Sequence, residues 1–241
     1  MTLKNAYGAF SKYYDFLGWN KFAESASVRL RSFMKLHGAA PKSILDLACG
    51  TGELEWLFRE TPICIVGVDA SKGMLKAARK KCPGARFALG DAAAVRLARE
   101  FDMVLLLFDS ANHMNSLSHL KRVFKNARRH LKEGGFFVFD LLSDAGLEKW
   151  EHIDIRRGRD YTVISNGYYY PDDHSADIFI EAFVRTGRGF ERVCQKIVER
   201  TYRSADVFRI LKEAGFSKVT VSSYDPAEEL EHSSRLWFIC N

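Results

Sequence analysis

The chain has 241 residues, a length that fits one elaborated domain and allows a large buried core without a disulfide or a metal to hold it together. Its 36 Lys and Arg residues against 30 Asp and Glu residues give a formal net charge of +6, which invites a nucleic-acid interpretation. Three basic clusters span residues 72–81, 121–132 and 156–159. The first two lie on predicted helices whose other positions are apolar, so solvated outer helix faces explain them better and nucleic acid is disfavoured as a partner.

The five cysteines are scattered and form no Cys-x-x-Cys pair, so the sequence signals neither a zinc site nor a disulfide framework. We expect no metal, and a reducing cytoplasm suits these thiols. The first residues contain no apolar signal segment, and no apolar run approaches the length that crosses a bilayer. The sequence therefore predicts a cytoplasmic protein without a membrane partner.

Residues 1–40 combine an aromatic segment that includes Tyr14 with an amphipathic run that ends at Gly38. Pro41 closes the run, because the residue before a proline is biased away from helical geometry. We expect a helical cap over residues 1–40, ahead of the first strand.

Residues 43–52 read as a buried strand that runs into a glycine turn, and a helix pattern begins at Glu53. Gly50 and Gly52 lack Cβ atoms, so the backbone can turn sharply and let a ligand come close. The dinucleotide fingerprint requires a third glycine where this chain has Glu55, and the turn also lacks the Gly-Lys-Ser/Thr end of a P-loop. The turn therefore predicts a nucleotide-like ligand while disfavouring NAD and nucleoside triphosphates.

Asp46 lies inside this strand, where an unpaired buried carboxylate would be costly, so we expect it to have a partner. The segment Asp-Leu-Ala-Cys-Gly-Thr-Gly at 46–52 resembles the first motif of class I S-adenosylmethionine (SAM) dependent methyltransferases. The resemblance implies SAM as the cofactor and S-adenosylhomocysteine as its product, with the acid and the turn around the amino acid end of SAM. The cofactor-binding residues that it implies in this segment are Asp46, Ala48, Cys49, Gly50 and Gly52.

Asp69 ends the next apolar run, which begins at residue 63. It falls 17 residues after Gly52, roughly where nucleotide-binding folds place the carboxylate that holds the ribose hydroxyls. The residues that follow resemble the family's Val-Asp-x-Ser-x-x-Met-Leu pattern, which implies that Ala70 and Met74 line the adenine side. Ser71 in this pattern also makes a suitable helix N-cap.

Asp91 ends a third predicted strand, over residues 85–91. The Gly-Asp-Ala segment at 90–92 resembles the family's second acidic motif, which implies that Asp91 holds the adenine amino group, with Ala92 beside it. Three successive strands thus end at or close to an acid, and ligands of open α/β sheets bind at the carboxyl edge.

The most apolar strand spans 101–108 and leads into the segment from Asp109 to His113. In this family the substrate and the transferable methyl meet there, which adds Phe108 to the cofactor residues and places Tyr14 over the methyl. Asp109 and His113 are the general-base candidates, since histidine titrates in the right range, and a purely structural histidine is an equal alternative. The Asn-Pro-Pro-Tyr and Pro-Cys motifs of DNA methyltransferases are absent.

Strand and helix patterns alternate five times up to about residue 145, which predicts a parallel sheet. Residues 149–203 break this rhythm with antiparallel hairpins, whose turn signals are Asn166-Gly167, Pro171-Asp-Asp and Gly187-Arg-Gly189. Ser204 caps a last predicted helix, and two strands close the chain. We expect an α/β, Rossmann-like class I methyltransferase fold: a seven-stranded, mostly parallel sheet with helices on both faces. The core comprises 41–148 and 204–241, and 149–203 form an inserted antiparallel capping sheet.

The functional hypothesis is a methyltransferase that acts on a small molecule, with N-methylation slightly favoured over O-methylation. One alternative is a tRNA or protein methyltransferase, because of the basic charge; another is a SAM-binding protein without catalysis that acts through 149–203. That insertion either roofs the pocket or joins two subunits, so both a monomer and a homodimer remain open. An open pocket beside His113 would favour the enzyme.

Overall fold

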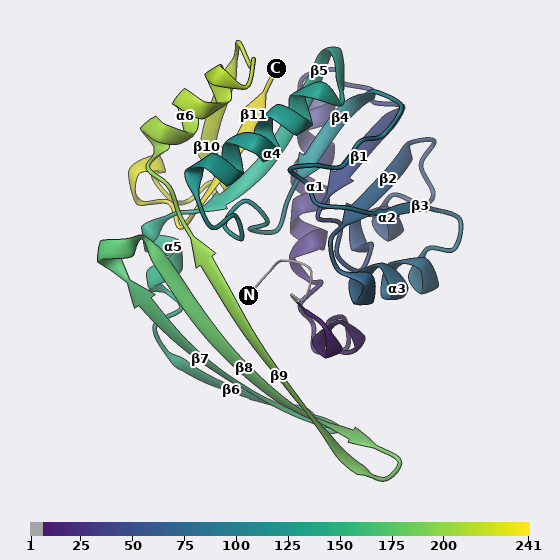
Figure 1. Cartoon of the computed structure of the whole chain (residues 1–241), viewed down its shortest axis with the longest axis vertical. Helices are drawn as coiled ribbons and strands as arrows, with labels where there is room; N and C mark the ends of the chain where they lie inside the picture. The colour runs from purple at the N-terminus through teal and green to yellow at the C-terminus, as the bar shows by residue number, and fades with distance from the viewer. Residues whose placement is uncertain (1–6) are drawn as a thin grey trace.

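The structure, a computed structural model, describes residues 7–241 and consists of two β-sheets with helices packed on the larger one (Figure 1). Sheet A has seven strands in the order β10-β11-β5-β4-β1-β2-β3. All of them run in the same direction except β11, which pairs antiparallel with both β5 and β10. Its strands are β1 (Ser43–Leu47), β2 (Cys64–Asp69), β3 (Arg86–Leu89), β4 (Phe101–Leu106), β5 (Leu131–Leu142), β10 (Val219–Ser223) and β11 (Arg235–Cys240). The predicted fold class is confirmed.

Helices cover both faces of sheet A, because its central strands are apolar on both sides. The helices are α1 (Phe22–Leu36), α2 (Glu53–Leu57), α3 (Lys72–Lys81), α4 (Leu117–Arg129), α5 (Asp144–Glu148) and α6 (Ser204–Glu213). In β1, Leu45 faces the cluster that contains α4 and α6, while Ile44 faces the one that contains α1 and α2. Ser71 and Ser116 accept hydrogen bonds from the first turns of α3 and α4 and so fix where these helices begin.

Sheet B is antiparallel in the order β6-β7-β8-β9 and extends away from the core as a long curved ribbon (Figure 1). Its strands are β6 (Ile153–Arg157), β7 (Tyr161–Tyr170), β8 (Ser175–Thr186) and β9 (Gly189–Arg200). Three short 3-10 helices complete the described chain: η2 (Ala9–Lys12), η3 (Pro171–Asp173) and η4 (Leu230–His232). The predicted turns at Pro171 and Gly187 are confirmed.

The predicted turn at Asn166-Gly167 is wrong, because both residues lie inside β7 and pair with β8. A Cβ on Gly167 would lie 1.8 Å from the carbonyl oxygen of Trp150, and the Gly167 N–H donates to the His152 carbonyl. Glycine is therefore required by the close approach of another backbone segment and not by a turn.

The N-terminal segment connects the two sheets. Phe10, Tyr13 and Leu17 pack in one apolar cluster with the inward side chains of sheet B, such as Val163 and Ile180. The same segment continues into α1, which packs on sheet A. The division of the chain into three units stays a prediction: a helical cap (1–40), a core (41–148 with 204–241) and an inserted capping sheet (149–203).

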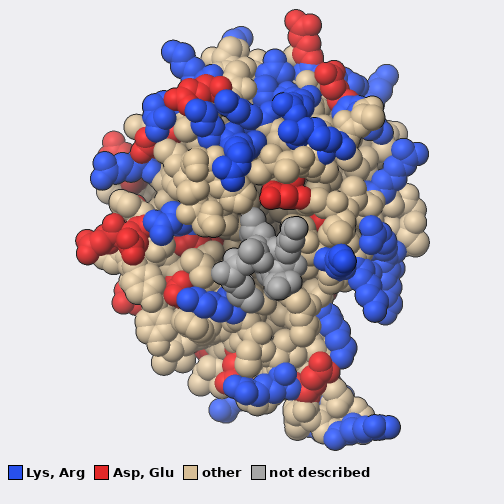
Figure 2. Space-filling view, in the orientation of Figure 1, with Lys and Arg blue, Asp and Glu red and all other residues tan. Residues whose placement is uncertain are grey.

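Lys and Arg gather over the part of the surface where Figure 1 places α4, as Figure 2 shows. The basic residues of α4 lie on its outer side, opposite the buried Leu120, Val123, Phe124 and Ala127. Among residues 7–241 no helix is long and apolar enough to span a membrane.

Replacing Gly167 by alanine should destabilise the fold by about 1–3 kcal/mol, because the new methyl group must displace a backbone carbonyl. Gly187→Ala is the matched control, since a Cβ there meets no atom within 4 Å. Urea unfolding of the two variants measures the difference. Equal stability of both variants would contradict the close contact.

Candidate active site

A backbone turn after β1 forms the floor of the site. Ala48, Gly50 and Gly52 have φ values of 60°, 56° and 73°, in the left-handed region that glycine enters without strain. A Cβ on Gly50 would meet nothing within 4 Å, whereas one on Gly52 would lie 3.0 Å from the ring of Phe87. Gly50 therefore leaves space open for a ligand, and Gly52 allows the turn to pack on its neighbours.

Asp69, the last residue of β2, is tied to this turn. Its Oδ2 accepts a hydrogen bond of 2.9 Å from the Gly50 N–H, and its Oδ1 accepts one of 2.7 Å from the Ser71 N–H. Burial raises the pKa of Asp69, and the two backbone donors oppose that effect. Each oxygen keeps a free lone pair, so Asp69 can still accept hydrogen bonds from a ligand.

A cavity with about 960 Å³ of empty space opens above the turn. Most of the predicted site residues line it: Tyr14, Ala48, Cys49, Gly50, Asp69, Ala70, Met74, Asp91, Ala92, Phe108 and His113. Sequence analysis missed several other lining residues, which include Tyr7, Trp19, Asn20, Ser110 and Met114. Those before residue 21 come from the N-terminal segment, which closes one side of the cavity.

Asp46, Gly52 and Asp109 do not line this cavity. Asp46 is 1% exposed, and its Oδ2 has no hydrogen-bond partner among the described residues, so the partner that we expected is not found. Glu55 is also buried, and both of its oxygens lack partners in the same part of the chain. Burial and then the charge of Glu55 raise the pKa of Asp46 well above its usual value, while burial raises the pKa of Glu55 to about 7.

The lining fits SAM. Asp69 offers a partly buried carboxylate to hydroxyl groups, and the open space at Gly50 admits a ligand against the backbone. Ala70, Met74 and Ala92 offer an apolar surface to a purine.

Asp109 is bound to Arg235 instead of facing the cavity. Arg235 lies at the start of β11, and its guanidinium is 2.9 Å from Asp109 Oδ1 and also contacts Asp140 of β5. Burial acts to raise the pKa of Asp109, but Arg235 and a hydrogen bond with Glu199 lower it overall. Asp109 is therefore an ionised anchor whose charge is balanced by Arg235.

His113 lies at the upper end of the cavity, with its Nε2 3.2 Å from the Tyr7 hydroxyl. Burial lowers the pKa of His113, so the imidazole is neutral near pH 7, and burial keeps the Tyr7 hydroxyl protonated by raising its pKa. A hydrogen bond between the ring and the Val198 backbone raises the pKa of His113 and so partly opposes the effect of burial. These contacts favour the tautomer with its proton on Nδ1 and a lone pair on Nε2.

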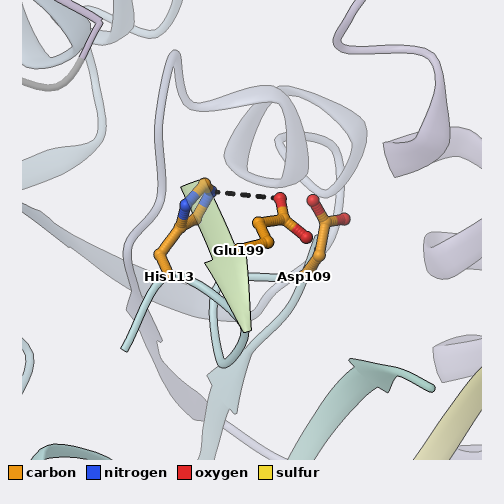
Figure 3. A group of neighbouring side chains, drawn as sticks. All are labelled: Asp109, His113 and Glu199. Atoms are coloured by element: carbon orange, nitrogen blue, oxygen red, sulfur yellow. Dashed lines mark ion pairs between the residues drawn. The ribbon is translucent and has the colours of Figure 1, made fainter. Parts of the chain in front are cut away.

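Glu199, on β9, completes a group of three side chains that point toward one another, with Glu199 between His113 and Asp109 (Figure 3). Its Oε1 lies 3.7 Å from His113 Nε2, and its side chain is 1% exposed. The sequence carries a signal for this residue that we did not use. Val193, Gln195, Ile197 and Glu199 alternate toward the buried face of β9, so an acid stands at a core position.

A second cleft adjoins the first cavity, and Tyr7 and His113 are among the residues that line both. It is bounded by residues 195–200 of β9, by the start of α3 with Lys72, and by the part of α4 that includes Arg122. His113 is thus reachable from two sides.

Comparisons with known proteins agree with this geometry. A family described as a methyltransferase domain matches residues 44–135. The YqeM protein of Bacillus subtilis (strain 168), a methyltransferase candidate, is 27% identical over 202 residues, which cover 81% of this chain and 82% of that protein. A dTDP-3-amino-3,4,6-trideoxy-alpha-D-glucopyranose N,N-dimethyltransferase of Streptomyces venezuelae is 28% identical over 151 residues, 61% of this chain and 63% of that enzyme. An S-adenosylmethionine-dependent methyltransferase structure from Clostridium acetobutylicum ATCC 824 has a TM-score of 0.83 at 25% identity, over 98% of each chain.

The seven-stranded sheet and the glycine turn give this chain the fold of a class I, Rossmann-like methyltransferase, to which it adds an inserted antiparallel sheet. It is an enzyme whose cofactor is S-adenosylmethionine, converted to S-adenosylhomocysteine. The roles of its individual site residues stay predictions.

Asp69→Ala should weaken SAM binding by at least about 100-fold, because hydrogen bonds to a charged acceptor contribute about 1.5–3 kcal/mol each. Calorimetric titration of SAM measures the change, and Asp172→Ala, at an exposed acid, is the control. Wild-type affinity in Asp69→Ala would remove Asp69 from the cofactor site.

Glu55→Gln should change how stability depends on pH. A carboxyl group with a raised pKa in the folded state binds its proton more tightly there than in the unfolded chain, so stability falls as the pH rises from about 4.5 to about 7. The variant should lose that fall and gain on the order of 3 kcal/mol at pH 8 relative to pH 4. Chemical unfolding at both pH values tests this, with the exposed Glu60→Gln as control. An unchanged pH dependence would show that Glu55 does not titrate in this range.

Proposed function

We propose that the enzyme transfers the methyl group of SAM to an amine nitrogen of a small molecule, with the acceptor entering through the second cleft. The observation that carries this proposal is a neutral, partly buried His113 that lines both cavities. SAM supplies an electrophilic methyl group, so the protein has to place the acceptor and remove a proton.

His113 is suited to receive that proton. Its Nε2 carries the lone pair in the favoured tautomer and lies beside the Tyr7 hydroxyl, which is directed at it. Tyr14 packs edge-on against Tyr7, with ring centroids 5.7 Å apart, and helps to hold the segment in place. Holding two reactants in attack geometry can contribute several kcal/mol, up to about 7–11.

The strength of this base favours nitrogen over oxygen. Burial has lowered the pKa of His113, which makes the ring a weak base. A weak base can take the proton of an ammonium group, whereas a hydroxyl requires a much stronger one. The relative from Streptomyces venezuelae that is named as an N,N-dimethyltransferase supports the same choice.

An amino sugar that carries phosphate is the acceptor to test first. The dTDP-linked amino sugar in the name of that relative is one such compound. Lys72 and Arg122 in the second cleft have no ion-pair partner among the described residues, and cations of this kind attract phosphate.

The rival hypotheses receive less support. The basic side chains of α3 and α4 lie largely on the outer faces of these helices, which suits solvent exposure as well as tRNA or protein binding. A SAM-binding protein without catalysis would have a blocked space at His113, and here the second cleft reaches that residue.

We further propose a cytoplasmic location, supported by the two exposed free thiols Cys64 and Cys194. The exposed apolar side chains Ile153, Ile155 and Phe179 on sheet B support a homodimer that forms through residues 149–203. In a monomer these side chains would face solvent.

Formation of S-adenosylhomocysteine, measured with matched amino and hydroxy forms of a phosphorylated sugar, tests the proposed function. We expect turnover with the amine alone, and turnover with the hydroxy form alone would overturn the proposal. His113→Ala should lower kcat by about 100-fold or more without changing SAM affinity, and the exposed His232→Ala should not. Unchanged turnover in His113→Ala would remove this residue from the mechanism.

A further inference from the structure

Glu199 is a buried acid that the proposed methyl transfer does not yet use. Its side chain is 1% exposed, yet it lies on the strand that borders the second cleft. Oε1 faces His113 Nε2 at 3.7 Å, and the other oxygen points toward Asp109 (Figure 3). A side chain this deep touches both the candidate base and its charged neighbour.

The surroundings of Glu199 indicate which protonation state it takes. As a carboxylate, its Oε2 would have no hydrogen-bond donor among the described residues. As a carboxylic acid, the same oxygen can donate its proton to Asp109, whose negative charge Arg235 holds in place. Two adjacent carboxylates cannot easily both ionise beside a single guanidinium that is shared with Asp140. Burial, and then the charge of Asp109, accordingly raise the pKa of Glu199 well above its ordinary value.

We propose that Glu199 is a positioning residue that acts as a neutral carboxylic acid: it donates a hydrogen bond to Asp109 and presents Oε1 to Nε2 of His113. This inference rests on the proposed function. When the ammonium group of the acceptor gives its proton to Nε2, the N–H bond of the acceptor breaks, a new N–H bond forms on the ring, and the positive charge moves to His113. Oε1 then faces an N–H group, and the charge of Asp109 lies close behind.

Glutamine is the variant that separates this role from others, because it is uncharged, has nearly the same shape, and offers both a carbonyl oxygen and an N–H donor. Glu199→Gln should therefore keep kcat within about threefold of wild type, while Glu199→Ala should lower kcat by up to about 100-fold. SAM affinity, measured by calorimetry, should stay unchanged in both variants and show that they are folded.

The pKa of His113, followed by NMR on the protein with labelled histidine and without acceptor, gives a second readout that does not depend on turnover. His113→Gln identifies its signal. We expect Glu199→Gln to leave this pKa unchanged and Glu199→Ala to shift it. A structural role of Glu199 that does not involve His113 would move neither the signal nor the pH profile of kcat.

Three results would overturn the proposal. If Glu199 were ionised, Glu199→Gln would lower both kcat and the pKa of His113, since a negative charge would be lost. If the three side chains bound a metal, addition of Zn²⁺ or Mn²⁺ alone would shift the histidine signals of wild type and not of Glu199→Gln. If the pKa of His113 were equal in all variants, the contact would be inert. Should no amine be methylated, the proposed function fails, but the NMR comparison still decides the state of Glu199.

Discussion

The carboxyl edge of sheet A depends on one partly buried cation, Arg235. Its guanidinium binds Asp109, after β4, and Asp140, in β5, so it joins three segments that are far apart in the sequence. Phe108 and Asp109 both have positive φ values, which cost free energy in residues other than glycine, and the Asp109 N–H donates to Asp140. Removing one partner of a buried ion pair costs about 3–5 kcal/mol, because the other charge is left uncompensated. The ion pairs therefore hold the strained bend that directs the following segment, and His113 with it, toward the cofactor cavity.

The cofactor half of the site could be predicted because it is local. The turn at Gly50 and the acids Asp69 and Asp91 lie at ends of neighbouring parallel strands, so sequence order and the alternation of strands and helices already bring them together. Asp46 was the exception. It shares the β1 segment but points away from the cavity, because successive side chains of a strand face opposite sides, and it meets the buried Glu55. A motif therefore predicts the ligand, whereas the position of each of its members relative to the cavity depends on the direction of that side chain.

Of the acceptor half, the sequence pointed to Tyr14, Asp109 and His113 but not to Tyr7 or Glu199, because its parts come from separate regions of the chain. Tyr7 reaches His113 across 106 positions, and Glu199 approaches from a strand of sheet B. No short-range pattern records such contacts. Gly167 shows the same limit in the fold: an Asn-Gly pair usually marks a turn, yet here the glycine admits the carbonyl of Trp150, which local sequence cannot reveal. The sequence does retain the alternation of inward and outward side chains along β9. Glu199 is an acid at an inward position of this strand, and an exception of this kind indicates a function.

The long reach of Arg235 also has a consequence for synthesis of the protein. Asp109 and Asp140 are translated 126 and 95 positions before their common cation. Until β11 leaves the ribosome, burying these two acids carries an unbalanced negative charge, and β5 has no partner on its outer edge. Sheet A therefore closes only after nearly all of the described chain has been made, so the nascent polypeptide spends most of its translation with an unfinished central sheet and is exposed to chaperones for that time.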